Sequence, residues 1–125
     1  MWSNEYFYFE IRFNQTYSHT INSTKLLAFL INEIHLVSDG TDSLIGNPKQ
    51  PWMNLTIIKA SKDGSFTSQN KCPEKVNLIS IIGSKSNDFC KYEEILIKIS
   101  QWLKWELIEE EDDDGNENVI IWSPK

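Results

Sequence analysis

The chain has 125 residues, of which 40% are hydrophobic and 24% are charged, and its formal net charge is −6. This length predicts one globular domain over residues 1–125 with a single buried core. The excess of 18 acidic over 12 basic residues argues against direct nucleic-acid binding and against attachment to an anionic membrane, since both need clustered Lys and Arg. It favours a basic protein partner, and acidity that serves solubility alone is the alternative.

The ends and the cysteines predict a cytoplasmic protein. The N-terminus has no basic segment followed by a long apolar run, so we expect no signal peptide. No apolar stretch approaches the ~20 residues that span a bilayer. Cys72 and Cys90 form no CxxC pair, and we expect both to be free thiols. The sequence leaves the oligomeric state open.

The first predicted element is a strand in the stretch YFYFEIRF, residues 6–13. Its apolar face consists of Phe7, Phe9, Ile11 and Phe13. Its other face consists of Tyr6, Tyr8, Glu10 and Arg12. This alternation is typical of a half-buried strand in an antiparallel sheet, with Arg12 and Glu10 as an expected ion pair.

A helix, a loop and two or three strands are expected next. Apolar residues recur at helical spacing over residues 26–36, after Asn22, Ser23 or Thr24 as the cap. Residues 38–51, rich in Gly and Pro, predict a long loop, and such loops are often functional. Strands are then predicted over the three stretches 52–60, 65–70 and 75–83, the last of them central because both of its faces are apolar.

The last third of the chain predicts a helix and a hairpin. The helix has an apolar stripe from Phe89 to Leu103 that includes Trp102 as a core residue, with Asn87 or Ser86 as the cap. The hairpin joins strands over 106–109 and 118–122 through a turn at Asp114-Gly115, since an Asp-Gly step between β-forming runs favours a hairpin.

This order of elements predicts an α+β fold. We expect an antiparallel or mixed sheet of about five strands with two helices on one face. The pattern approaches the split βαβ arrangement of ferredoxin-like domains, with an added C-terminal hairpin. One face of the sheet would then be open, and the first strand would present Tyr6, Tyr8, Glu10 and Arg12 on it.

Residues 110–121 can be aligned with an EF-hand loop, but the alignment fails. With Gly115 at the sixth position, Ile121 occupies the twelfth, where calcium needs a bidentate carboxylate. A weak, non-specific calcium site at this turn is the alternative. His19 and His35 have no partner at zinc-ligand spacing. We therefore expect no metal and no cofactor.

The sequence predicts no enzyme activity. It contains no GxSxG, no SxxK and no glycine-rich phosphate loop. Cys90 begins a helix, but a free cysteine more often packs in a core than reacts. The carboxylates of residues 109–114 are expected to be solvated and ionised at a hairpin tip, which makes them poor general acids.

What remains is a recognition surface that combines an acidic run with aromatic residues. The predicted partner-binding residues are Glu109, Glu110, Glu111, Asp112, Asp113, Asp114, Glu117, Tyr6, Tyr8 and Glu10. Four of the five tryptophans, all except Trp102, lie at the ends of predicted elements, where they either close the core or form interface hot spots. The alternative for the acidic run is a plain solvated turn.

A short acidic α+β chain with the run EEEDDD, the aromatic strand YFYFEIRF and no catalytic constellation resembles the immunity proteins of bacterial polymorphic-toxin and contact-dependent growth inhibition systems. The resemblance is one of general profile over the whole chain. It implies a protein that binds and neutralises a cognate basic toxin domain, often a nuclease, by blocking its active or substrate-binding site. Residues 109–114 and Glu117 would then pair with cationic toxin residues and mimic phosphates.

Two other functions compete with this one. The first is a small-ligand-binding sensor or small enzyme of ferredoxin-like fold that uses the open sheet face, with Tyr8, Glu10 and Arg12, or the 38–51 loop. The second is an adaptor subunit that dimerises through an exposed edge strand.

Overall fold

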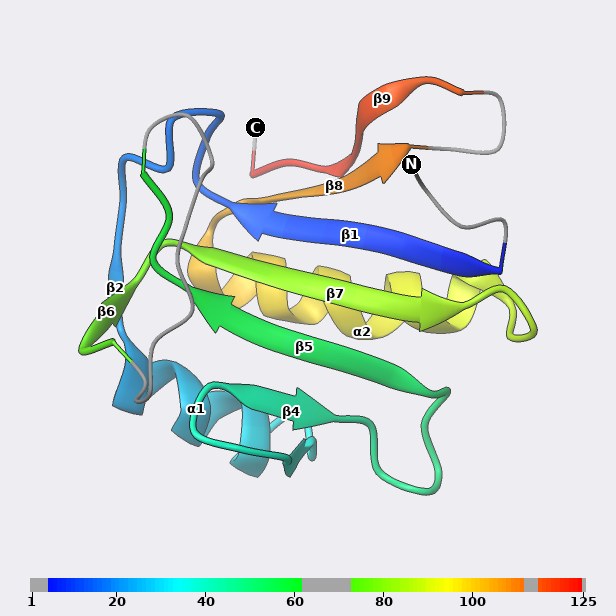
Figure 1. Ribbon diagram of the computed structural model, residues 1–125, viewed down its shortest axis with the longest axis horizontal. Coiled ribbons are helices and arrows are strands. Elements are labelled where there is room, and N and C mark those ends of the chain that lie inside the picture. Colours follow the sequence, from blue (N-terminus) through cyan, green and yellow to red (C-terminus); the bar gives the residue numbers. More distant parts are fainter. Residues whose placement is uncertain (1–4, 62–72, 112–114, 125) are drawn as a thin grey trace.

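The computed structural model describes residues 5–61, 73–111 and 115–124, and Figure 1 shows their arrangement. The helices are α1 (Ser23–Asn32) and α2 (Phe89–Leu103). The strands are β1 (Tyr6–Arg12), β2 (Ile21–Asn22), β3 (Val37–Ser38), β4 (Ser43–Ile45), β5 (Met53–Ile58), β6 (Lys75–Val76), β7 (Leu78–Ser84), β8 (Glu106–Glu111) and β9 (Glu117–Trp122). Seven strands form one sheet in the order β3-β4-β5-β7-β1-β8-β9, and β2 pairs with β6 in a second sheet.

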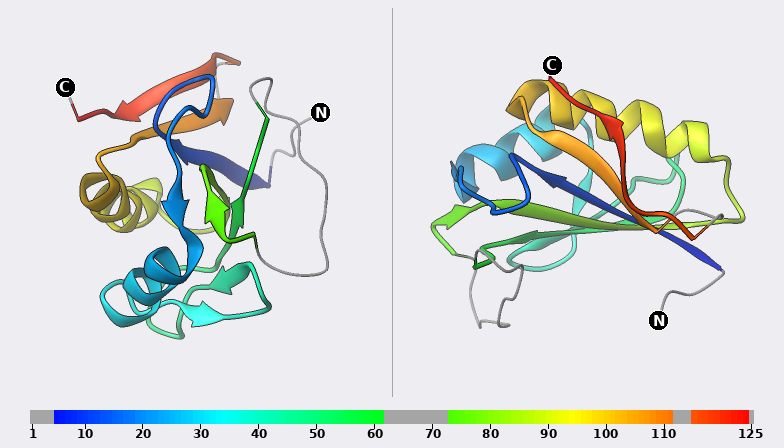
Figure 2. Two further views of the ribbon diagram at one scale, coloured as in Figure 1. Left: turned by 90° about the vertical axis from the view of Figure 1, so that its left-hand side faces the viewer. Right: turned by 90° about the horizontal axis from the view of Figure 1, so that it is seen from above.

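Every neighbouring pair in the large sheet is antiparallel, and both helices cover the same face. The right-hand view of Figure 2 shows α1 and α2 in one layer and the sheet in another. The core lies between these layers and is built from alternate residues of the central strands, such as Phe9, Ile79 and Leu55, together with Leu26 and Leu96 of the helices. In the part of the chain that the structure describes, the opposite face of the sheet carries no helix.

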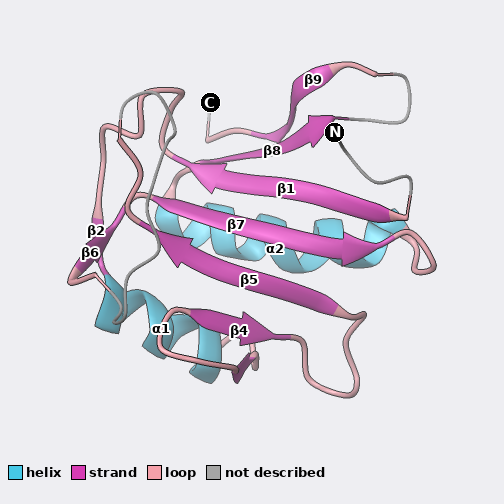
Figure 3. Ribbon diagram, in the orientation of Figure 1, coloured by secondary structure: helices cyan, strands magenta, loops and turns pink. Residues whose placement is uncertain are grey.

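The predicted α+β class with two helices is confirmed, but the sheet has more strands than the expected five or so. The additional strands β2, β3, β4 and β6 have two or three residues each, which is too short for a periodic pattern to be visible. Both β3 and β4 lie at or inside the predicted 38–51 loop, and Figure 3 shows a loop continuing from β4 to β5. The strand predicted over 65–70 lies outside the described residues.

The two helix caps follow different chemistry. Asn22 caps α1 as predicted, because its Oδ1 accepts a hydrogen bond from the Lys25 backbone N–H at 3.0 Å. The cap of α2 is Asp88 rather than Asn87 or Ser86, and its side chain makes no capping bond. The Asn87 amide instead donates to the Tyr92 hydroxyl at 3.1 Å.

Two residues of α2 that were expected in the core, Trp102 and Cys90, are exposed. Trp102 is 38% exposed and stacks flat on Phe29 of α1, with ring centroids 4.0 Å apart. Trp105, just after the helix, is buried in its place. Cys90 is a free thiol, as predicted, but it is exposed rather than packed in the core.

Within the described ranges, no helix is long and apolar enough to cross a membrane.

Tyr92 connects α2 to the sheet through the packing of its ring and the hydrogen bonds of its hydroxyl group. Its ring is fully buried against Gly83 of β7, where a Cβ atom would lie only 2.8 Å from two ring carbons. Its hydroxyl donates to the Trp52 carbonyl at 2.6 Å and accepts from the Ser84 backbone N–H at 2.8 Å. The absence of a side chain at position 83 therefore sets the distance between helix and sheet.

Candidate functional site

The open face of the sheet carries a cluster of charged side chains where β1 lies beside β8. In this register Glu10 is opposite Ile108, and Arg12 is opposite Glu106. Because side chains alternate along a strand, Glu106, Ile108 and Glu110 share the face that carries Glu10 and Arg12. We call Glu10, Arg12, Tyr17, Glu106 and Glu110 the carboxylate cluster.

Arg12 is the centre of this cluster and is only 5% exposed. Its Nε lies 2.9 Å from Glu106 Oε2, and its Nη1 lies 3.3 Å from Glu10 Oε1. Burial by itself would lower the pKa of Arg12. The hydrogen bonds with Glu106 and Tyr17 and the charges of Glu10 and Glu106 outweigh that effect and raise it. Arg12 is therefore a permanent cation enclosed by carboxylates, and the predicted Arg12–Glu10 pair is confirmed.

Tyr17 closes one end of the cluster from the loop that follows β1. Its hydroxyl donates to Glu10 Oε1 at 3.2 Å, and the Arg12 guanidinium lies 5.8 Å from its ring centroid. Burial, and then the charge of Glu10, raise the pKa of Tyr17. The loop is held by Asn77, whose amide donates to the carbonyls of Tyr17 and Ala60 at 3.1 and 2.9 Å.

Glu110 is the unusual member of the cluster. Burial, a hydrogen bond to Glu10 and the charge of Glu10 raise its pKa to about 8, although Arg12 acts in the opposite direction. This raised pKa favours the protonated form of Glu110 at neutral pH, in which its carboxyl group is hydrogen-bonded to Glu10. Such a carboxyl–carboxylate pair can release a proton or exchange it for another cation.

The acidic run is not a single solvated turn, so that expectation is wrong for its first two residues. Strand β8 continues to Glu111, and its residues alternate between the two faces. Glu109 points toward the helix side and is only 7% exposed, whereas Glu110 joins the cluster on the open face. The predicted site residues Asp112, Asp113 and Asp114 lie outside the described residues.

The remaining predicted residues lie apart from one another. Glu117 begins β9 and is exposed, opposite Glu111 at the end of β8. Tyr6 is exposed at the start of β1 and contacts Trp52, with ring centroids 6.0 Å apart. Tyr8 is half-buried and lies two residues before Glu10, on the same open face. The structure thus unites Glu10 and Glu110 and leaves Glu109 and Glu117 elsewhere.

Sequence reasoning missed two members of the cluster, Glu106 and Tyr17, and it placed Glu110 in a solvated turn rather than beside Glu10 on a strand. A signal existed for the two glutamates, because 106, 108 and 110 follow the period of two that places them on one face of a strand. The charge run hid this alternation by suggesting a turn. No sequence signal marks Tyr17, whose position depends on Asn77, 60 residues further along the chain.

Strand β9 is the last strand of the large sheet, next to the cluster. Ile120 faces the open side opposite Ile108 and is 59% exposed. The register shifts between Leu107 and Ile108, and Asn118 has a φ of 52°, so this edge is irregular. Bulged edges discourage the addition of another strand. The edge therefore offers side chains rather than a regular row of backbone groups.

No group of three or more His, Cys, Asp or Glu side chains that could hold a metal ion occurs among residues 5–61, 73–111 and 115–124. No protein-family model matches the chain, and neither the curated proteins nor the solved structures include a significant match.

Proposed function

We propose that this protein binds and neutralises a basic partner, a toxin domain of nuclease type, through the open sheet face at β1, β8 and β9. The observation that carries the proposal is the Glu10–Glu110 pair, two carboxyl groups hydrogen-bonded to each other on the sheet face opposite the helices. A Lys or Arg side chain of a partner can replace the proton of this hydrogen bond and form charge-assisted bonds to both groups.

Exposed apolar and aromatic side chains on or beside β1, β5 and β9 suit a protein partner. Tyr6, Trp52 and Ile120 are all exposed large side chains. Such groups are enriched in interface cores, while the charged groups around them orient the partner. In this proposal Glu10 and Glu110 occupy phosphate positions on the toxin from the open face. Glu117, which the register of β8 and β9 places on the other face, adds negative charge at the edge of the sheet. Glu109 is buried and contributes through the fold.

The test is a calorimetric titration with a basic nuclease toxin domain, at low and high salt. We expect the triple variant Glu10→Gln, Glu110→Gln, Glu117→Gln to bind at least about tenfold more weakly and with a smaller salt dependence. The matched control is Glu94→Gln, an exposed carboxylate on α2 in the other layer. Equal affinity of the triple variant and the control would overturn the proposal.

The same pair favours a second candidate, a small-ligand sensor or enzyme on the open face. A protonated carboxyl beside an ionised one is the arrangement used for proton transfer.

We also propose that the four central strands, β5, β7, β1 and β8, are a variant of the ferredoxin-like arrangement. In support, β7 lies between β1 and β5, and β1 lies between β7 and β8, so both βαβ units are split by a strand.

A further inference from the structure

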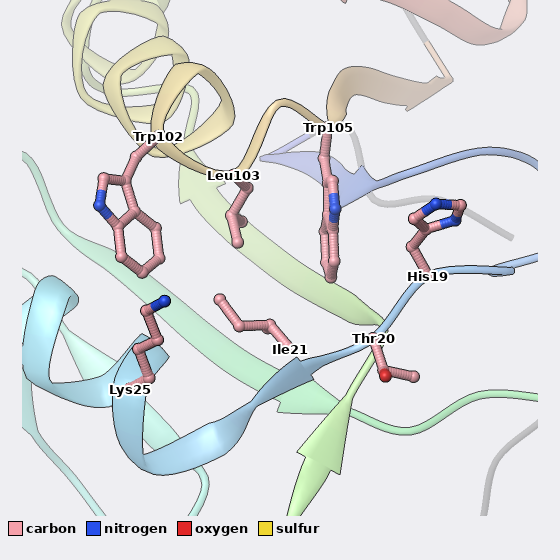
Figure 4. Close-up of a pocket in the computed structure, with 7 residues that line it drawn as sticks. All are labelled: His19, Thr20, Ile21, Lys25, Trp102, Leu103 and Trp105. Carbon is pink, nitrogen blue, oxygen red and sulfur yellow. The ribbon is translucent and has the colours of Figure 1, made fainter.

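A second site lies away from the open face, where the end of α2 meets the start of α1. It is a pocket of about 400 Å³. The residues that line it are His19, Thr20, Ile21, Lys25, Trp102, Leu103 and Trp105 (Figure 4). Its volume falls within the range of small-molecule sites in proteins, about 300–1,000 Å³.

Two indole rings form the walls of this pocket. Figure 4 shows Trp102 and Trp105 on either side of Leu103 and Ile21, with both rings directed toward the same space. Trp102 is supported by its stacking on Phe29, at an interplanar angle of 7°. Trp105 is buried, and its backbone N–H donates to the Ser100 carbonyl at 3.1 Å. These walls are formed before any ligand arrives, so little ordering entropy opposes binding.

The polar groups of the pocket are the Lys25 ammonium, the His19 ring and the Thr20 hydroxyl. The Lys25 ammonium lies beside Trp102, and the His19 ring lies on the far side of Trp105 (Figure 4). None of the described residues that line the pocket is acidic, although the chain as a whole carries a charge of −6. The His19 ring is held by stacking on Phe13, with centroids 3.5 Å apart.

The helix ends act in opposite directions. Lys25 lies in the first turn of α1, where the helix dipole adds positive potential. The C-terminus of α2 adds negative potential, but part of it is offset because the Ser100 carbonyl accepts from the backbone N–H groups of both Lys104 and Trp105. The side-chain charge of Lys25 therefore decides the sign of the ligand.

We propose that this pocket binds a small organic anion with a flat apolar body, such as an aromatic carboxylate or sulfonate. The ring of the ligand lies between Trp102 and Trp105 over Ile21 and Leu103, where aromatic contact adds to the gain from burial. Its anionic group pairs with Lys25. The site is independent of the proposed partner-binding face, and either proposal can stand without the other.

The test uses two fluorescent probes that share a ring system, anilinonaphthalene sulfonate and its neutral analogue phenylnaphthylamine. We expect the sulfonate to bind more tightly and to shift the indole N–H signals of Trp102 and Trp105 in NMR spectra, but not that of Trp52. Lys25→Met should weaken sulfonate binding about tenfold and change binding of the neutral probe less than about twofold.

Two further variants keep the test decisive. Trp102→Leu, at an exposed position, should weaken the binding of both probes. Lys49→Met, which removes a lysine from a separate pocket lined also by Lys91 and Glu94, should change neither. Equal sulfonate affinity in Lys25→Met and Lys49→Met would overturn the proposal, and so would probe binding that leaves both indole signals unmoved.

Discussion

The Glu110 side chain on β8 is hydrogen-bonded to the Glu10 side chain on the adjacent strand β1, and this contact helps to raise the pKa of Glu110 to about 8. Glu10 lies near the start of the chain and Glu110 near its end, so the two side chains meet only when the sheet has formed. The formal net charge of −6 counts Glu110 as ionised. At neutral pH the folded protein is therefore less negative than its composition suggests, and one of its carboxyl groups is a hydrogen-bond donor.

The stability of the protein should fall as the pH rises through the titration of Glu110. Its pKa is about 8 in the fold against an ordinary value of 4.5, so the folded state holds more protons than the unfolded state between these values. We expect the free energy of unfolding, measured with urea, to be about 1–2 kcal/mol lower at about pH 9 than at about pH 5. Glu110→Gln should remove that difference, and an unchanged pH profile in this variant would contradict the assignment.

Arg12 should be the most sensitive position of the carboxylate cluster. Arg12→Met keeps the aliphatic stem but leaves Glu10 and Glu106 without their buried cation. Breaking a buried ion pair from one side costs about 3 kcal/mol or more, so we expect a loss of that size in chemical denaturation. Lys59→Met, an exposed lysine, is the control and should change stability by less than about 0.5 kcal/mol.

Gly83→Ala should destabilise the protein, because the new Cβ would lie 2.8 Å from the buried Tyr92 ring. Overpacking of this kind costs about 1–3 kcal/mol, and the ring cannot move away without losing its hydrogen bond to the Trp52 carbonyl. A double-mutant cycle with Tyr92→Leu measures the clash directly. The two substitutions should be less than additive, and strict additivity would place the strain elsewhere.

Long periodic segments explain how much of this fold could be predicted from the sequence. The alternation of YFYFEIRF and the apolar stripe of α2 each extend over two or more turns or pleats, so β1 and α2 were predicted nearly to their ends. Strands such as β3 and β4 are too short to have a pattern, and only their pairing with β5 defines them.

The candidate site was harder to predict, for a related reason. Arg12 and Glu10 are two residues apart on one strand, so their pairing could be inferred locally. The burial of Glu109 and the raised pKa of Glu110 depend on residues of β1 and α2 that pack against β8. Because these residues are distant in the sequence, neither property can be predicted from the acidic run itself. Trp102 is exposed, against expectation, and Trp105 is buried, because the chain turns between them at Lys104, which has a φ of 60°.

Partner binding through the Glu10–Glu110 pair should release a proton, and this prediction rests on the proposed function. A cationic side chain placed between the two groups lowers the pKa of Glu110 from about 8, so the proton leaves at neutral pH. Affinity for the toxin domain should then rise by up to about tenfold between about pH 6.5 and about pH 8.5.

Calorimetry in two buffers with different ionisation enthalpies counts the released protons directly. We expect up to one proton for the natural protein and a smaller number for Glu110→Gln, whose side chain has nothing to release. Titrating groups of the toxin contribute equally to both measurements, so the difference between the two proteins belongs to Glu110. Equal proton counts would show that the partner does not reach this pair, even where its affinity depends on Glu117.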